Sequence, residues 1–133
     1  MHALLFLSLT LLADDTKDAS NIQGTWIIES AMADGKEDNE IKGDRMTFKD
    51  GIVTVKTKEK DEKGTYKIDP SQKPKTIDIK EDGKDKVYQG IYKLEGDKLT
   101  ICIPEQAGNK HPTEFTAKEG SKQMILHHKR EKK

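Results

Sequence analysis

The sequence predicts an all-β fold, a single antiparallel up-and-down β-barrel of about eight strands. Three observations support this prediction. Short segments alternate apolar and polar residues with the period of two that is typical of half-buried strands. Turn-forming residues separate these segments at near-regular intervals, and no convincing amphipathic helix lies between them. With 133 residues, the chain has the size of one domain.

The expected strands follow one another through short connections. They cover residues 24–32, 46–49, 53–56, 64–69, 76–80, 87–94, 99–103 and 123–130. Short turns favour antiparallel neighbours in up-and-down order. Eight such strands can close on themselves, which removes the unpaired edges that an open sheet would have to protect.

The first strands are marked by alternation and by Asp-Gly pairs. Trp26 and Ile28 share one face of the first strand, and Asp34-Gly35 ends it. The polar stretch 36–44 is expected to be a loop, with at most one helical turn. Asp50-Gly51 separates two alternating segments, and it predicts a tight hairpin because both residue types tolerate the positive φ of a type I′ turn.

Proline and glycine mark the later connections. Pro70 and Pro74 cannot donate to a sheet ladder, so they are expected between the fourth and fifth strands. Turns containing Gly83 and Gly96 lead into the sixth and seventh strands, and Pro104 ends the seventh. Residues 105–122 form a longer loop before the last strand.

The alternation also predicts which side chains fill the barrel. The inward set is expected to be Trp26, Ile28, Met32, Met46, Phe48, Val53, Val55, Tyr66, Ile68, Ile77, Ile79, Tyr92, Leu99, Ile101, Ile103 and Phe115. On the last strand, Met124 and either Ile125 or Leu126 are expected to turn inward. Charged residues make up 36% of the chain, and the same period places them on the outside.

The charge balance argues against several partner classes. Lysine plus arginine and aspartate plus glutamate both total 24, so the formal net charge is zero. No net field attracts nucleic acid or an anionic membrane surface. We therefore expect no nucleic-acid partner.

The N-terminus resembles a signal peptide. Residues 3–13 are uncharged and mainly apolar, Asp14-Asp15 follows at once, and the run is too short to span a bilayer. We expect a signal peptide over 1–13, a polar leader over 14–21, the barrel over 22–130 and a charged tail over 131–133. The mature protein would be periplasmic or extracellular, without membrane insertion.

A series of short motifs carries a family resemblance. It consists of Gly24-Thr25-Trp26, Asp34-Gly35-Lys36, residues 64–70, residues 73–78, Gly90-Ile91-Tyr92, residues 96–99 and residues 112–115. The first motif resembles the Gly-X-Trp signature of lipocalins. The whole series resembles a lipocalin-like domain of unknown function that is abundant in planctomycete bacteria. His111 departs from the basic residue, often arginine, expected before residues 112–115.

This resemblance implies a closed barrel but transfers no catalytic residue. In lipocalin-like barrels a basic residue near the end of the last strand covers the tryptophan of the first. Gly24 and Trp26 are therefore expected at the barrel closure, with Arg130 as the covering residue and Lys129 as the alternative. An arginine over the indole would add a cation–π attraction and shield the ring from water.

No catalytic or metal site is expected. Cys102 alternates with the apolar positions of its strand, so it lies outside the lumen or beneath a loop and is interpreted as a structural thiol. As the only cysteine, it cannot form an intramolecular disulfide. His127 and His128 are adjacent on a strand and point to opposite faces, so they cannot share one ion, and His111 completes no coordination sphere.

Four residues are candidates for contact with a ligand: Tyr66, Tyr92, Glu114 and Phe115. Glu114 could line the barrel opening and receive a polar group, or it could anchor its loop, and the second reading is favoured because a buried carboxylate needs partners. Phe115 beside it is interpreted as a plug. The other carboxylates, such as Asp69, Asp78, Glu81 and Asp82, are expected to be solvated.

The sequence thus predicts an exported, noncatalytic binding module without a cofactor. Small barrels offer a cavity for one ligand, so a small apolar or amphipathic molecule is expected in the lumen or at its mouth. The alternative is a protein-interaction or envelope-associated structural module whose lumen is packed solid. An enzyme ranks third.

Overall fold

The computed structural model of the protein describes residues 17–132. The predicted signal peptide and the first residues of the predicted polar leader lie outside the described residues. No helix within residues 17–132 is long and apolar enough to cross a membrane. A short helical turn at residues 17–21 comes first, and everything after it is built from strands and their connections.

Nine strands make up the sheet of the described chain. They are β1 (Gly24–Ala33), β2 (Lys36–Glu37), β3 (Arg45–Lys49), β4 (Ile52–Lys56), β5 (Asp61–Asp69), β6 (Thr76–Glu81), β7 (Tyr88–Glu95), β8 (Lys98–Pro104) and β9 (Gln123–Arg130). Eight of them coincide with the strands predicted from alternation. The ninth, β2, lies in the stretch expected to be a loop.

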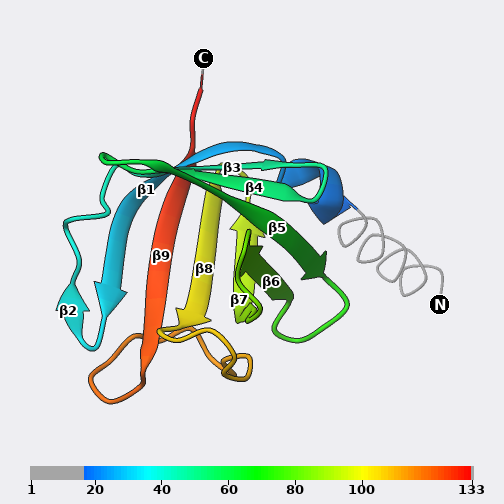
Figure 1. Cartoon of the computed structure of the whole chain (residues 1–133). Helices are drawn as coiled ribbons and strands as arrows, with labels where there is room; N and C mark the ends of the chain where they lie inside the picture. The colour runs from blue at the N-terminus through cyan, green and yellow to red at the C-terminus, as the bar shows by residue number, and fades with distance from the viewer. Residues whose placement is uncertain (1–16, 133) are drawn as a thin grey trace, which may run out of the picture.

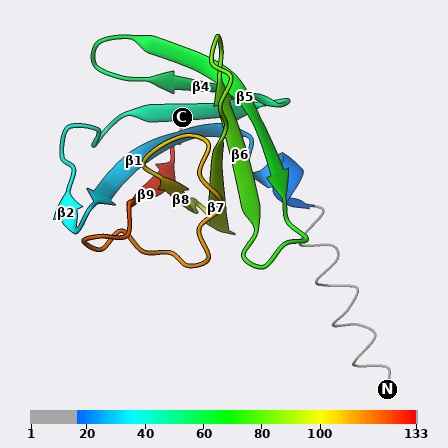
Figure 2. The same cartoon turned by 60° about the horizontal axis from the view of Figure 1, so that its bottom comes forward.

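The sheet closes into a barrel because β1 pairs with both β3 and β9 (Figures 1 and 2). From β3 to β9, each strand pairs with the next one in the chain, always antiparallel. The two-residue β2 pairs only with the end of β1 and stands outside the ring of eight. The predicted antiparallel, up-and-down barrel of eight strands is confirmed.

The predicted hairpin at Asp50-Gly51 is present between β3 and β4. Asp50 has φ 49° and Gly51 has φ 85°, and both values lie in the region that a type I′ turn requires. A side chain at Gly51 would meet no atom within 4 Å. Glycine is therefore favoured there by backbone conformation alone.

A β-bulge changes the face to which the end of β1 points. The register between β1 and β9 shifts between Ile28 and Ser30, so Glu29 is an extra residue on β1. Beyond this point the alternation is inverted. Ala31 is buried at 2% exposure, whereas Met32 is 38% exposed. The expectation that Met32 faces the lumen is wrong for this reason.

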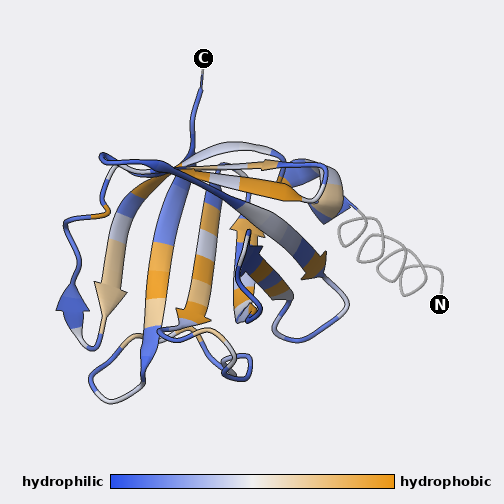
Figure 3. Ribbon diagram, in the orientation of Figure 1, coloured by the Kyte–Doolittle hydropathy of each residue, from blue (hydrophilic) through white to orange (hydrophobic). Residues whose placement is uncertain are grey.

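The barrel interior is filled by the apolar positions of the alternating strands, visible as orange bands in Figure 3. The buried core consists of Ile22, Trp26, Met46, Phe48, Val53, Ile77, Tyr92, Leu99 and Ile101. All except Ile22 belong to the inward set predicted from the sequence. Ile22 follows the helical turn and is fully buried.

The long connection 105–122 covers the outer face of the barrel wall. Ile91 on β7 and Cys102 on β8 are paired neighbours that point away from the lumen, yet both are buried. The Cys102 Sγ lies 3.5 Å from the Thr116 carbonyl oxygen of this connection. Phe115 lies here too, with the Lys93 Nζ 5.0 Å from its ring centre. Since Lys93 alternates with the inward Tyr92, Phe115 is outside the lumen, and its predicted inward position is wrong.

One histidine is part of the core. His128 on β9 is 1% exposed, and its Nδ1 donates to the Leu99 carbonyl oxygen at 3.1 Å. Its Nε2 lies 3.2 Å from the Met46 sulfur. Burial lowers the pKa of His128 from 6.5 to about 4, so the ring is neutral at physiological pH. The neighbouring His127 is exposed on the outer face, as the alternation predicts.

This burial predicts a specific pH dependence of stability. A histidine whose pKa is lower in the folded state takes up its proton first in the unfolded chain, so the stability of the fold falls as pH falls. Between pH 6.5 and about 4, this single group should cost about 3 kcal/mol of unfolding free energy. Urea titrations of His128→Asn across this range should show a shallower loss than the wild type.

The adjacent His127→Asn provides the matched control. It makes the same substitution one residue away on the exposed face, so it should retain the full loss of stability in acid. A shallower loss in His127→Asn, with the wild-type loss retained in His128→Asn, would contradict the assignment.

Candidate functional site

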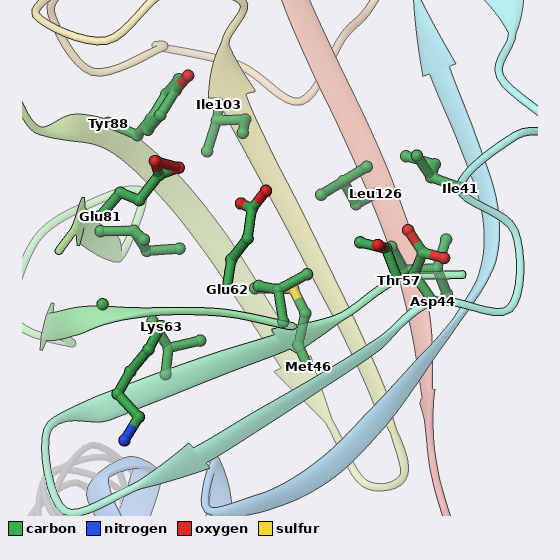
Figure 4. A pocket seen from close by; sticks show the side chains of 15 residues that line it. Ile41, Asp44, Met46, Thr57, Glu62, Lys63, Glu81, Tyr88, Ile103 and Leu126 are labelled. Carbon is green, nitrogen blue, oxygen red and sulfur yellow. The ribbon is translucent and has the colours of Figure 1, made fainter. Parts of the chain in front are cut away.

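The barrel contains a cavity of about 300 Å³ at the end where β4, β6 and β8 finish. Its wall is mostly apolar and is contributed by strands around the whole ring. The apolar lining consists of Ile28, Ile41, Met46, Val53, Val55, Ile79, Ile103 and Leu126, with the ring of Tyr88 beside them (Figure 4). The volume is at the lower end of the range of small-molecule pockets.

Polar side chains join this apolar wall at the cavity. Asp44 comes from the connection before β3, Glu62 from β5 and Glu81 from the end of β6. In Figure 4 the Glu62 side chain lies between Asp44 on one side and Glu81 on the other, while the Lys63 ammonium points away from all three. The cavity is therefore an apolar chamber with carboxylates among its lining residues.

Asp44 is the most buried of these carboxylates, at 7% exposure. Its backbone is held at both ends, since its N–H donates to Ile41 and its carbonyl oxygen accepts from Ile28, both at about 3 Å. Desolvation raises the pKa of the Asp44 carboxyl, although the positive charge of Lys58 works against this shift. Sequence reasoning missed Asp44, because an aspartate after a glycine in a polar stretch is typical of a turn.

The opposite end of the barrel is closed by the helical turn 17–21 and the residue after it. Ile22 inserts its side chain into the core, and the Trp26 indole N–H donates to the Ile22 carbonyl oxygen at 2.8 Å. Residues 17–21 of the polar leader predicted over 14–21 therefore contribute part of the barrel's closure. The polar sequence of this leader hid the role, because the large apolar Ile22 comes only after its last residue.

A buried aspartate ties this helical turn to the barrel. Asp18 is 5% exposed, and its Oδ2 accepts from the Tyr92 hydroxyl at 2.7 Å and from the Lys75 ammonium at 2.9 Å. The positive charge and the hydroxyl supply the partners that a buried carboxylate requires. The Tyr92 hydroxyl thus bonds to the closed end, and Tyr92 does not line the cavity.

Arg130 covers the tryptophan at the barrel closure. Its Cζ lies 4.3 Å from the centre of the Trp26 ring, and the two residues are paired between β1 and β9. The guanidinium also donates to the Asn21 and Gln23 carbonyl oxygens, at 2.6 and 3.0 Å. A side chain at Gly24 would come within 3.1 Å of the Arg130 Nη1, so glycine leaves room for the arginine. Lys129 is exposed on the other face.

The structure does not bring the four predicted ligand contacts to the cavity. Tyr66 is inside the barrel but packs edge-on against Phe48 at 4.9 Å, within the packed half. Glu114 is exposed on the outer connection, and its backbone carbonyl oxygen accepts from Gln123 at 3.4 Å. With Tyr92 at the closed end and Phe115 on the outer wall, none of the four lines the cavity.

Cys102 and His111 make structural contacts, as His128 does in the core. Burial raises the pKa of Cys102, so the thiol stays protonated and is a poor nucleophile. His111 pairs with Asp78 at 2.7 Å and fastens the outer connection to β6. No group of three or more histidine, cysteine, aspartate or glutamate side chains within residues 17–132 is arranged to hold a metal ion.

The closure at Trp26 predicts the effect of removing its cover. Arg130→Ala should shift the fluorescence of Trp26, the only tryptophan, to longer wavelength, because water reaches the ring. The loss of the cation–π contact alone should lower the unfolding free energy by about 0.5–2 kcal/mol. Thermal unfolding and emission spectra measure both effects.

Lys129→Ala is the matched control, since it removes a neighbouring positive charge that does not touch the indole. It should leave the emission maximum unchanged. Equal red shifts in both variants would show that the position of Arg130 over the ring is not what protects it.

Comparison with known proteins identifies the family. The family model of the lipocalin-like domain matches residues 22–121 of the 133-residue chain. No curated protein and no solved structure matches the chain. The matched region begins at Ile22, which plugs the closed end, and includes β1 to β8 but not β9. The chain therefore belongs to the lipocalin-like domain family.

Proposed function

We propose that this protein is a noncatalytic binding protein that holds a small apolar or amphipathic molecule in the open half of its barrel. The observation that carries the proposal is the cavity of about 300 Å³, whose mostly apolar wall is built by strands around the ring. Apolar surface facing an open chamber favours any ligand that removes it from water. Membership in the lipocalin-like family supports this assignment, because such barrels serve as binding modules.

The arrangement of potential catalytic groups supports a noncatalytic role. The Cys102 thiol is buried on the outer wall beneath residues 105–122, away from the cavity. His128 points into the core, where its Nδ1 is committed to the Leu99 carbonyl oxygen. Neither group is placed to act on a molecule in the lumen.

The empty space in the open half also favours ligand binding over the alternative, an interaction module whose lumen is packed solid. Aromatic side chains such as Trp26, Phe48, Tyr66 and Tyr92 fill the closed half of the barrel. The strands continue beyond them, and there the lining is mainly aliphatic and surrounds empty space. A barrel that served only as a rigid scaffold would gain stability from filling this space.

A neutral fluorescent probe tests the proposal directly. N-phenyl-1-naphthylamine should bind the purified protein and increase in fluorescence. Val55→Phe adds a larger side chain to the cavity wall and should weaken probe binding about tenfold or more by occupying the space. Fluorescence titration measures the dissociation constants.

Ile52→Phe is the matched control on the same strand. Ile52 is 46% exposed and does not line the cavity, so this variant should bind the probe like the wild type. Ile103→Phe is a second cavity variant if Val55→Phe does not fold. Absence of probe binding by the wild type, or equal binding by all variants, would overturn the proposal.

We also propose that the protein acts after export. The support is the apolar run at residues 3–13, followed by Asp14-Asp15. N-terminal sequencing of the protein from its native host should begin near Asp14. A mature chain that starts at Met1 would contradict export by a cleaved signal peptide.

A further inference from the structure

The charges around the cavity are not balanced. Asp44, Glu62 and Glu81 line it, and the only basic residue of its lining is Lys63. Lys63 alternates with Glu62 along β5, and its ammonium points away from the chamber (Figure 4). The space next to the apolar wall therefore carries a negative potential, strengthened by the low dielectric of the surrounding side chains.

The three carboxylates differ in how they are compensated. Glu62 forms an ion pair with Lys60 at 3.1 Å, but the Lys60 side chain is 68% exposed, and such exposed pairs contribute little and exchange readily. Asp44 is more than nine-tenths buried, and no described residue forms a hydrogen bond or ion pair with its carboxylate. Glu81 has no ion pair among the described residues either, but it is only half-buried. Asp44 is therefore the buried carboxylate of the chamber without a hydrogen-bond or ion-pair partner within residues 17–132, and the positive charge of Lys58 offsets its desolvation only in part.

The backbone turn that contains Asp44 does not explain why this position carries an aspartate. The backbone hydrogen bonds of Asp44 hold the connection to β1, and an asparagine or serine could make them equally well. An aspartate kept only for the turn would cap a backbone N–H with its carboxylate, as Asp38 does for Glu40 at 3.1 Å. The Asp44 carboxylate instead lines the cavity, where its raised pKa reflects lost hydration.

We propose that the ligand of this chamber is an amine-bearing amphiphile, with its ammonium group at Asp44 and its apolar body along the aliphatic wall. This inference rests on the proposed binding function and names the chemical class of the ligand. An ammonium supplies the partly desolvated Asp44 carboxylate with a counter-charge and with charge-assisted hydrogen bonds.

The other residues of the chamber favour the same charge. Glu62 and Glu81 add negative potential, so they attract a cation and repel a fatty-acid carboxylate. Tyr88 adds an aromatic face beside Glu81, which also attracts an ammonium group. The aliphatic residues set the requirement for an apolar body, and the carboxylates set the charge of its head.

Competition among three matched probes tests the inference. Octylamine, octanol and octanoate share one alkyl chain and carry a positive, a neutral and a negative head at neutral pH. Each would be titrated against N-phenyl-1-naphthylamine bound to the full protein. Octylamine should compete best, octanol about tenfold less well, and octanoate least.

Asp44→Asn should remove most of the advantage of octylamine over octanol and leave the affinity for octanol unchanged. Asp61→Asn is the matched control, because Asp61 precedes Glu62 on β5, is exposed and does not line the cavity. It removes the same charge from the same molecule and should keep the wild-type order of the three probes.

The outcomes separate the two proposals. If N-phenyl-1-naphthylamine and all three alkyl probes fail to bind, the binding function itself is wrong. If the probes bind with equal affinity, or octanoate binds best, the chamber binds apolar molecules and the assignment to amines is overturned. If Asp44→Asn and Asp61→Asn weaken octylamine equally, net charge decides the preference and Asp44 is not the site of the ammonium.

Discussion

The closure of β1 on β9 depends on the environment of one indole. Trp26 is fully buried, its N–H donates to Ile22, and Arg130 lies on its ring. The same guanidinium binds two carbonyl oxygens of the chain that leads into β1. One side chain of the last strand thereby joins the start of the first strand, the helical turn and the core. Because the ring of eight strands has no free edge once β1 pairs with β9, each strand of the ring is held between two neighbours.

The barrel has two ends that differ in packing: a filled end around Trp26 and an end that holds the cavity. Around Trp26, aromatic rings and aliphatic side chains pack densely, and the buried Asp18 is satisfied by Tyr92 and Lys75. Toward the other end, the strands stay paired while their inward side chains are mainly aliphatic, with carboxylates among them, and leave space. The packed half contributes the hydrophobic stabilisation that a domain of this size needs. The open half can therefore keep exposed apolar surface and a buried carboxylate without endangering the fold.

Much of this architecture could be predicted from the sequence, because a strand with one buried face alternates strictly. The eight barrel strands, the turn at Asp50-Gly51 and the position of Trp26 all follow from that local rule. The helical turn 17–21 could not be predicted, since its one buried polar residue, Asp18, finds its partners on the distant Tyr92 and Lys75.

The candidate site was harder to predict than the fold. The lining of the cavity depends on where packing ends along each strand, and no local pattern records that boundary. Aromatic residues such as Tyr66 were predicted as ligand contacts because of their chemistry, but rings of this size fill the packed half. Phe115 was misplaced because residues 105–122 fold over the outside of the wall instead of over the mouth. Asp44 is distinguished only by its three-dimensional surroundings.

The bulge at Glu29 determines which side chains of β1 face the interior next to the chamber. With unbroken alternation, the long side chain of Met32 would point inward; one extra residue places the single methyl group of Ala31 there instead. Ile41 packs into the cluster formed by Ala31 and its neighbours, and the segment that carries Ile41 ends at Asp44. The extra residue Glu29 thus places Ala31 where Ile41 packs, and the segment that carries Ile41 also carries Asp44. The shape and charge of the chamber are consequently properties of strand register as well as of side-chain identity.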